Sequence, residues 1–216
     1  MSVIQDIGLS ALRWFLGLIT GCILGIVLVG IGHQKRYRNR ILEKIVDFLR
    51  AIPIIGLVPI IQMNIGVREY GKIGLIAWGV MFPVWITVRS VAKREFIDLE
   101  LMLSAVRLKN REYGKLYLFP KLIGGLLNGI DIGIGIAWLC VVASEWVGTY
   151  SKGFWSGGLG ASLLIEYNNN NWLKVHVYLL LFGALGLLSA FLWKKLKRYV
   201  IGRLNGFDPE RWLKRG

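Results

Sequence analysis

Five apolar stretches divide the chain of 216 residues. They cover about residues 9–31, 51–63, 73–88, 122–147 and 175–193. A membrane-crossing helix needs about 20 apolar residues, so the pattern predicts an all-α, polytopic membrane helical bundle with about five transmembrane helices. The second stretch is short and contains Pro53 and Pro59, so we expect it to be kinked or partly irregular and sheltered by other helices.

Two of the polar segments between these stretches also have a helical pattern. In residues 33–50 the apolar positions recur at helical spacing, which predicts an amphipathic helix on the cytoplasmic face of the membrane. Residues 89–121 form the longest polar segment and carry apolar residues such as Leu99 and Leu103 at similar spacing. We expect one or two cytoplasmic helices there, ending before Pro120.

Lysine and arginine residues are sorted between alternate gaps. Of the 27 basic residues, 22 lie in the gaps 33–52 and 88–122 or in the tail that begins at residue 193. Because basic loops stay on the cytoplasmic side of a membrane, this sorting predicts an N-terminus outside and a C-terminus inside. The net charge of +14 is then explained by topology and by anionic membrane lipid rather than by nucleic acid.

The sequence carries no motif of a catalytic or metal site. It has no GxxxxGK[ST] loop for ATP phosphates, no HExxH and no CxxC. Cys22 and Cys140 lie inside apolar stretches and are expected to be small buried residues, while His33 and His176 have no partners at ligand spacing. Function is therefore expected in a pathway through one membrane domain, residues 1–216, or in contacts with partner proteins.

Two acidic residues lie inside the fourth apolar stretch. Asp131 and Glu145 are 14 residues apart, which puts them on roughly one face of a helix, and an acid inside the bilayer needs a cavity or a partner. Glu145 and Gln62 have an alternative interpretation, in which they lie among the lipid headgroups. For Asp131 the alternative is a structural pair with a lysine or a backbone donor of a neighbouring span. The candidate pathway or gate residues are Gln62, Asn64, Asn128, Asp131, Trp138 and Glu145.

Five segments carry a resemblance to a known family. In chain order they are SALRWFLGLITGCILGIVLVGI, ILEKIVDFLRAIPIIGLVPI, NIGVREYGKIGLIAWGVMFPVWI, GGLLNGIDIGIGIAWLCVVASEWVG and GGLGASLLIEY. Together they resemble the membrane permease subunit of binding-protein-dependent ABC importers, in the nitrate, sulfonate, taurine and bicarbonate branch. The last segment is similar to that branch's external Gly-Leu-Gly loop, here Gly158, Leu159 and Gly160. The resemblance implies a type I ABC importer permease-like fold in a prokaryotic inner (plasma) membrane.

The long cytoplasmic loop departs from the family's pattern. That pattern is E-A-A, a glycine four residues later, and a closing I-x-L-P; anchored on Pro120, it places Leu101 at the Glu position and Arg107 at the Gly position. Compared with that pattern, we expect the chain to begin at the family's second span, without the family's N-terminal helix. The candidate ATPase-coupling residues, within a loop of about residues 89–121, are Glu100, Leu101, Leu103, Arg107, Arg111 and Pro120.

The resemblance also implies partners. In such importers two permease chains, as a homodimer or heterodimer, form the pathway, two ATPase subunits bind ATP and Mg on the cytoplasmic side, and an external solute-binding protein delivers a small anionic or zwitterionic solute. This chain would then need no cofactor and would not itself be an enzyme. Two alternatives stay open. One is a degenerate permease-like subunit that assembles or regulates a transporter without carrying the pathway, which the lost loop consensus favours. The other is a stand-alone channel or secondary transporter, against which the lack of an inverted repeat counts.

Overall fold

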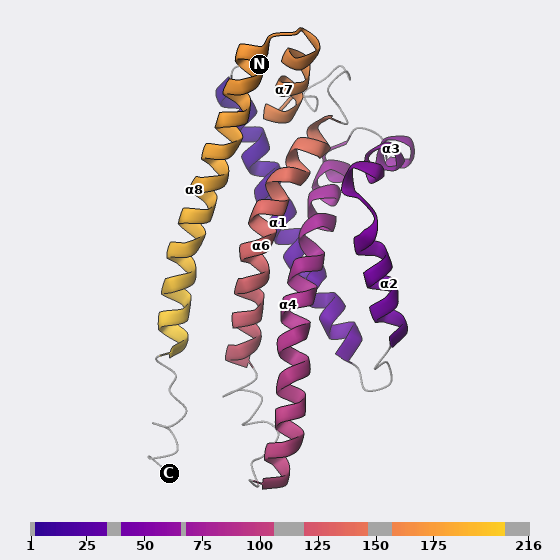
Figure 1. The fold of residues 1–216 in the computed structure, drawn as a ribbon, viewed down its shortest axis with the longest axis vertical. Coiled ribbons are helices and arrows are strands. Elements are labelled where there is room, and N and C mark those ends of the chain that lie inside the picture. Colours follow the sequence, from indigo (N-terminus) through magenta and orange to yellow (C-terminus); the bar gives the residue numbers. More distant parts are fainter. Residues whose placement is uncertain (1–2, 34–39, 66–67, 106–118, 147–156, 206–216) are drawn as a thin grey trace.

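The computed structural model describes residues 3–33, 40–65, 68–105, 119–146 and 157–205, and this part of the chain is all-α (Figure 1). Its helices are α1 (Val3–His33), α2 (Arg40–Ala51), α3 (Ile54–Ile65), α4 (Glu69–Ala105), α6 (Phe119–Trp146), α7 (Leu159–Asn168) and α8 (Trp172–Asn205). Four of them contain a stretch long and apolar enough to cross a membrane: Val3–Ile31, Glu69–Lys93, Lys121–Trp146 and Trp172–Arg203.

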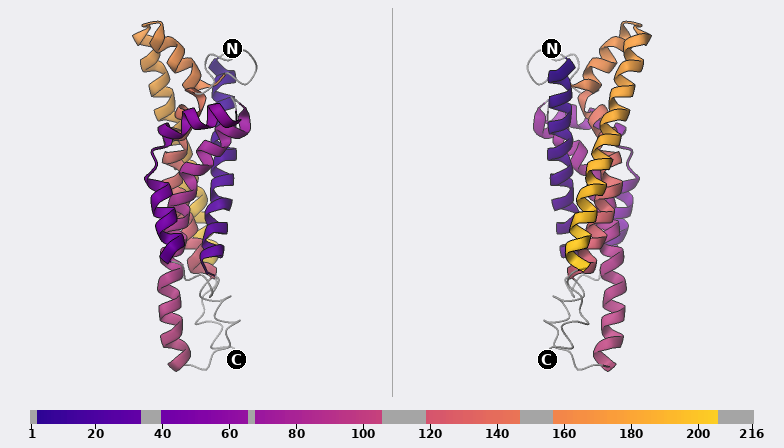
Figure 2. Two further views of the ribbon diagram at one scale, coloured as in Figure 1. Left: turned by 90° about the vertical axis from the view of Figure 1, so that its right-hand side faces the viewer. Right: turned by 90° about the vertical axis from the view of Figure 1, so that its left-hand side faces the viewer.

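The second predicted crossing differs from the other four. Its proline-containing core forms α3, which has 12 residues and at 1.5 Å per residue is only about 18 Å long. α1 and α4 run in the same direction, and α2, which lies between them in the sequence, runs the opposite way (Figure 1). The return passage is therefore made by the short helix α2, α3 lies across the bundle near the start of α4 (Figure 2), and α8 ends at the opposite end of the bundle from the start of α1.

The amphipathic helix predicted before α3 is confirmed as α2, and its place on the cytoplasmic face of the membrane stays a prediction. α2 runs alongside α4 (Figures 1 and 2) and packs Val46 against it, whereas Ile45 and Phe48 of its apolar stripe are exposed. Val46 is 2% exposed and belongs to one cluster with Met81 and Trp85 of α4. Glu43 of α2 forms an ion pair with Arg89 of α4. Amphipathic spacing shows that one face is apolar, but it does not distinguish a lipid surface from a neighbouring helix.

The core of the bundle lies between α1, α4 and α6. Gly17, Gly21 and Gly25 of α1 face α4, and a Cβ built on Gly21 would lie 2.8 Å from the carbonyl oxygen of Ala77. Small residues at every fourth position let two helix backbones approach closely, which is how membrane helices pack without a hydrophobic driving force. Val80 of α4, opposite this stripe, is 0% exposed.

α4 and α8 extend the fold in different ways. α4 continues past its apolar part to Ala105, so it is one helix of 37 residues that projects beyond the ends of α1 and α6 (Figure 1). This confirms the expected helix at the start of the long polar segment, of which residues 106–118 lie outside the described part of the chain. In an apolar 18-residue window of α8 only 11% of the residues are buried within this chain, against 67% in the corresponding window of α4.

α7 and the first turns of α8 form a helical hairpin over one end of the bundle, at the top of Figure 1. We call this end, where α1 also begins, the α7 end. Leu159, Leu163 and Tyr178 form an apolar cluster inside the hairpin, and Ile7 of α1 packs against it. The hairpin thus lies against the start of α1 as well as the last turns of α6.

Candidate functional site

Glu145, in the last turn of α6, lies at the centre of a buried polar site at the α7 end. Its residue exposure is 0%. Oε1 accepts hydrogen bonds from Arg13 Nη1 at 2.8 Å and Ser10 Oγ at 2.7 Å, and Oε2 accepts one from the backbone N–H of Gly160 at 2.7 Å. The interpretation that Glu145 lies among lipid headgroups is therefore wrong. A buried carboxylate is tolerated only with this kind of partner set.

Arg13 of α1 joins four parts of the chain through one guanidinium. It forms a two-pronged contact with Glu69 of α4, with Nε 2.8 Å from Oε2 and Nη2 2.6 Å from Oε1. Its Nη1 also donates to Glu145 of α6 and, at 2.5 Å, to the carbonyl oxygen of Gly157 just before α7. The rigid fork of arginine suits such bidentate contacts, which a lysine cannot reproduce. Lys72 adds a second buried cation, with Nζ 3.5 Å from Glu69 Oε1.

The first backbone N–H groups of α7 are capped by side chains of other helices. The N–H of Gly158 donates to Asp6 Oδ1 at 3.1 Å, and the N–H of Leu159 donates to Ser10 Oγ at 2.9 Å. Ser162 Oγ also donates to Asp6, at 2.7 Å. The first N–H groups of a helix lack hydrogen-bond acceptors within the helix and favour nearby negative charge. Asp6, Ser10 and Glu145 supply these acceptors for α7.

Gly158 is required by both backbone shape and space. Its φ of 129° is rarely adopted by residues with a side chain. A Cβ there would lie 2.3 Å from Glu145 Oε1, and a Cβ on Gly160 would lie 3.1 Å from Val142 Cα. The predicted Gly-Leu-Gly loop is thus brought directly onto Glu145. We call the whole set the Arg13 network; its side chains are Asp6, Ser10, Arg13, Glu69, Lys72, Glu145 and Ser162, and its backbone groups are those of residues 157–160.

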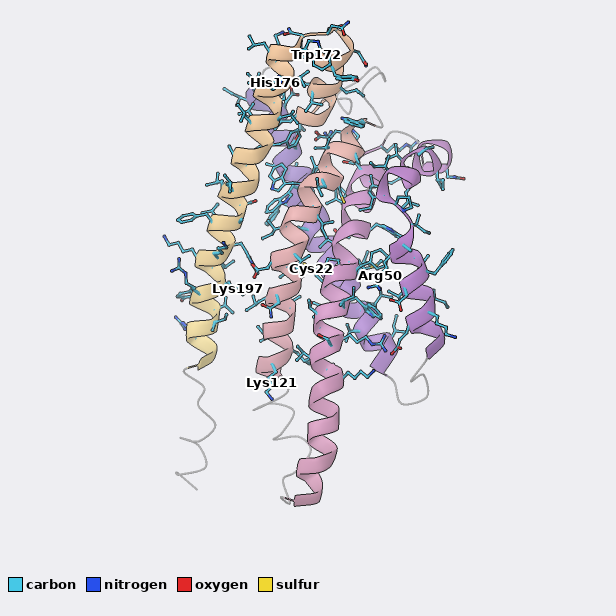
Figure 3. The ribbon with its side chains drawn as sticks, in the orientation of Figure 1. Cys22, Arg50, Lys121, Trp172, His176 and Lys197 are labelled. Carbon is cyan, nitrogen blue, oxygen red and sulfur yellow. The ribbon has the colours of Figure 1, made fainter. Side chains whose placement is uncertain are left out.

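Asp131 lies elsewhere, where α6 faces α8. It forms an ion pair with Lys197, whose Nζ also donates to Asn128 Oδ1 at 3.0 Å. Figure 3 shows Lys197 on the side of α8 that faces α6. The side chains of Asp131 and Lys197 are 36% and 20% exposed, so this contact is much more open than the Arg13 network. A lysine of a neighbouring span is one of the partners considered for Asp131.

Trp138 lies on α6 between Asp131 and Glu145, and it packs α6 against α1 and α8. Its ring stacks on Trp14 of α1 with centroids 5.5 Å apart, and its Nε1 donates to Ser189 Oγ of α8 at 3.0 Å. On α3, Asn64 is exposed and donates to the carbonyl oxygen of Ile60 in its own helix. Gln62 is on the same helix, with its side chain outside the described set. The six predicted pathway residues are therefore spread over separate places instead of one continuous row.

The predicted coupling residues lie at the other end of α4. Glu100, Leu101 and Leu103 belong to its final turns, although their side chains are not among those described. Arg107 and Arg111 fall outside the described residues. Pro120 is the second residue of α6, where a proline fits because the first turn of a helix needs no N–H donor. Within the described ranges, no cluster of three or more His, Cys, Asp or Glu residues could hold a metal ion.

A family model matches residues 17–202, a range that includes most of α1 and all of α2, α3, α4, α6 and α7. The chain belongs to the family of binding-protein-dependent transport system inner membrane components. This confirms the family suggested by the five sequence segments, and it makes the chain a multi-pass plasma membrane permease.

Three relatives support the same branch. The permease is 27% identical to a protein of Bacillus subtilis named as an aliphatic sulfonates transport permease, over 93% of this chain and 70% of the relative. It is 26% identical to a Synechocystis protein named as a nitrate import permease, over 83% of this chain and 63% of the relative. It is 25% identical to a Synechococcus elongatus protein named as a bicarbonate transport system permease, over 86% and 65%.

A solved structure has the same fold. The permease matches a chain of the MetNI methionine ABC transporter, solved in inward-facing conformations, with a TM-score of 0.59 over 92% of this chain and 94% of that chain. Sequence identity is 20%, so this likeness concerns the fold. It confirms the all-α importer-permease architecture expected from sequence.

The residues predicted from sequence to form a site include only two parts of the Arg13 network, Glu145 and the Gly-Leu-Gly loop. The other members of the network were not among the predicted site residues of the permease. One signal for the rest is present in α1. Asp6, Ser10 and Arg13 are spaced by four and three residues, so they share one helix face, and Gly17 continues that face. A second signal is that Arg13 is an exception to the sorting of basic residues. An intramembrane charge of this kind indicates a buried acidic partner.

Proposed function

We propose that the permease is the transmembrane subunit of an ATP-driven importer and forms, with a second permease chain, the pathway for a small anionic or zwitterionic solute. The solute would be of the nitrate, bicarbonate, sulfonate or taurine type, because proteins named for sulfonate, nitrate and bicarbonate transport are similar over most of this chain. The observation that carries the proposal is the family match over residues 17–202.

In this proposal the α7 end faces outward, toward an external solute-binding protein. Its support is the distribution of charge along the helices. Arg89 and Lys93 lie toward the far end of α4, and the basic run 194–198 lies in the last turns of α8, both away from the α7 end. Because basic residues are retained in the cytoplasm, the N-terminus is outside and the C-terminus inside.

The projecting end of α4 fits a role in coupling to two ATPase subunits, which would bind ATP and Mg and carry out hydrolysis. The end of α4 and the start of α6 flank the loop, so a partner docked there would act directly on two core helices of the bundle. Movement of docked subunits can be passed on by rigid-body displacement of such helices. No cofactor is assigned to this chain.

The coupling role is tested by replacing an apolar residue of α4 with a charge. Leu103→Asp is expected to release the ATPase subunits or to uncouple their hydrolysis from transport, since a charge buried in an apolar contact leaves it without a partner. A charge reversal at Arg107 tests the same loop outside the described helix. A complex and a transport rate that stay unchanged in both variants contradict docking at this loop.

Asp131 is assigned to the pathway or its gate without direct contact to the solute. A carboxylate repels an anionic solute, and the carboxylate of Asp131 already forms an ion pair with Lys197. Lys197 and Asn128 hold it in place between α6 and α8. The pair would therefore position α8 against α6 on the cytoplasmic half of the pathway.

The experiment for the overall function is co-purification followed by uptake. The protein is purified in mild detergent, co-purifying ATPase and lipoprotein subunits are identified, and the complex is reconstituted into liposomes. ATP-dependent uptake of isotope-labelled taurine, bicarbonate and nitrate is then measured, with a non-hydrolysable nucleotide as the control. Uptake of none of the three in a complex that hydrolyses ATP contradicts the solute class.

A second candidate function is favoured by the lost consensus of the long loop, where Leu101 and Arg107 replace the family's Glu and Gly. In that case the chain would be a degenerate subunit that assembles or regulates a transporter. Uptake that persists when this chain is omitted, but at a changed level of assembled complex, would favour it over the importer proposal.

A further inference from the structure

One face of α8 is left uncovered by the described part of this chain. α8 packs on α6 and α7 through the face that carries Tyr178, Phe182 and Ser189. With 3.6 residues per turn, the residues on the opposite face are Leu173, Leu180, Leu187, Phe191, Lys194 and Arg198. We call this set the outer face of α8. Its apolar side chains are open, since Leu180 is 74% exposed and Leu187 76%.

The apolar part of the outer face has the length of the hydrocarbon core of a membrane. Lys174 and Lys194 are 20 positions apart, and no Lys, Arg, Asp or Glu lies between them. At 1.5 Å per residue this separation is about 30 Å, the thickness of the hydrocarbon core. Trp172 and Tyr167, with ring centroids 5.6 Å apart, mark the border beside Lys174, because such rings favour the interface between lipid and water. Lys194 therefore enters the headgroup layer at the border remote from α7.

The basic residues at this remote border are divided between the protein and its surroundings. Lys197 turns toward α6, where it forms an ion pair with Asp131. Lys194, Lys195 and Arg198 are exposed, and no ion pair joins them to a residue in the described ranges. Long basic side chains lay their apolar stems along a hydrophobic surface and place their charge among the headgroups. A complementary partner therefore has a negative charge at this depth and an apolar part inside the membrane.

We propose that the outer face of α8 binds anionic phospholipid. The phosphate lies between Lys194 and Arg198, which are one helical turn apart, and an acyl chain runs along Leu187 and Phe191. A second permease chain is less complementary, because it is inserted in the same direction and brings its own basic end to the same depth. The inference needs α8 to span the membrane, and it does not depend on the solute or the ATPase subunits proposed above.

A lipid titration tests the charged half of this site. Phosphatidylglycerol is added to the purified, delipidated complex and the bound lipid is counted by native mass spectrometry, with phosphatidylcholine as the neutral probe. The test variant is Lys194→Gln with Arg198→Gln. The matched control is Lys44→Gln with Lys93→Gln, which removes the same charge from exposed positions of α2 and α4.

The unsubstituted chain is expected to bind phosphatidylglycerol more tightly than phosphatidylcholine. Each basic residue at an anionic surface contributes about fivefold in affinity, so we expect a loss of about tenfold or more in the test variant and of about twofold or less in the control. Equal affinity for the two lipids overturns the proposal, and so does a test variant that loses no more affinity than the control. These measurements use no solute and no ATP, so their outcome is separate from any failure of the importer function.

A spin label identifies what covers the apolar half of the outer face. Leu187→Cys is labelled in vesicles of phosphatidylglycerol and phosphatidylcholine, with Cys22→Ala and Cys140→Ala to remove the native thiols. Leu185→Cys, on the packed face of α8, is the control. Oxygen, which concentrates among acyl chains, is expected to relax the label at Leu187 strongly and a water-soluble nickel chelate weakly. The label at Leu185 is expected to respond weakly to both.

The spin label also distinguishes the other possible occupants of this face. A weak response to both reagents at Leu187 means that protein, such as a second copy of this chain, covers the face, and it overturns the proposal. A strong response to the nickel chelate means that the face lines a water-filled space, which overturns it as well. The lipid titration needs none of the cysteine substitutions, so it decides the case in which they disturb folding.

Discussion

The two acidic residues of α6 show how differently one helix can use the same side-chain chemistry. Glu145 is 0% exposed and has three hydrogen-bond donors from α1 and α7, while the Asp131 side chain is 36% exposed and meets Lys197 of α8. The first site joins four helices, and the second joins two. Because electrostatic contacts weaken with exposure, the Glu145 site is expected to control folding and assembly, and the Asp131 site to affect transport more than stability.

The largest effect is expected from Arg13→Leu, which leaves the buried Glu145 and the half-buried Glu69 without their common partner. Removing one member of a buried ion pair destabilises by about 3–5 kcal/mol, so we expect a large loss of folded protein in detergent. Arg13→Lys keeps the charge but not the fork and is expected to be intermediate. The yield of monodisperse protein and its thermal unfolding midpoint are the measurements. Equal stability of the Leu variant and the natural chain would mean that the network does not hold the bundle together.

A smaller but still clear effect is expected from Gly158→Ala. The substitution forces a side chain into a positive-φ conformation and against Glu145, and strain of this kind costs roughly 1–3 kcal/mol. Gly135 of α6 is the matched control, because a Cβ there would meet nothing within 4 Å. Gly135→Ala is expected to be neutral or slightly stabilising. The two thermal midpoints are compared in the same detergent, and a fall of equal size in both variants would remove the special role of Gly158.

The smallest effect on stability is expected at Asp131. Its partly exposed ion pair contributes about 0–1 kcal/mol, so Asp131→Asn and Lys197→Met should leave the amount of complex nearly unchanged. Asn keeps the shape and much of the hydrogen bonding, whereas Asp131→Leu removes both. If the charge acts in a gate, Asn reduces uptake in an intact complex. If the contact is only structural, Asn is tolerated and Leu lowers the amount of complex.

The outcome at Asp131 also sharpens the comparison with Glu145. Normal uptake in both the Asn and the Leu variants would show that Asp131 has neither role. A loss of assembled complex as large as that of Arg13→Leu would show that exposure is a poor guide to the importance of these two acids. Either result is read from uptake and complex yield in the same preparation.

The membrane spans were largely predictable from sequence. The long apolar stretches near residues 9–31, 122–147 and 175–193 correspond to α1, α6 and α8, because span length and hydropathy are local properties of the chain. The pairing of α2 with α4 was not predictable, since an apolar stripe does not specify what covers it. Glu145 was recognised as unusual in the sequence, but its burial was not.

The sequence by itself determined that this protein is an all-α membrane permease, and it identified the family, the Gly-Leu-Gly loop and the two acids of the fourth span. Only the tertiary structure decided which acid is buried. The partners of Glu145 lie far away along the chain, with Arg13 separated from it by 132 residues. Each of these polar residues alone is costly in an apolar environment, and their cost is offset only when helix packing brings α1, α4, α6 and α7 to one point. That convergence is a property of the packed bundle and of no single segment.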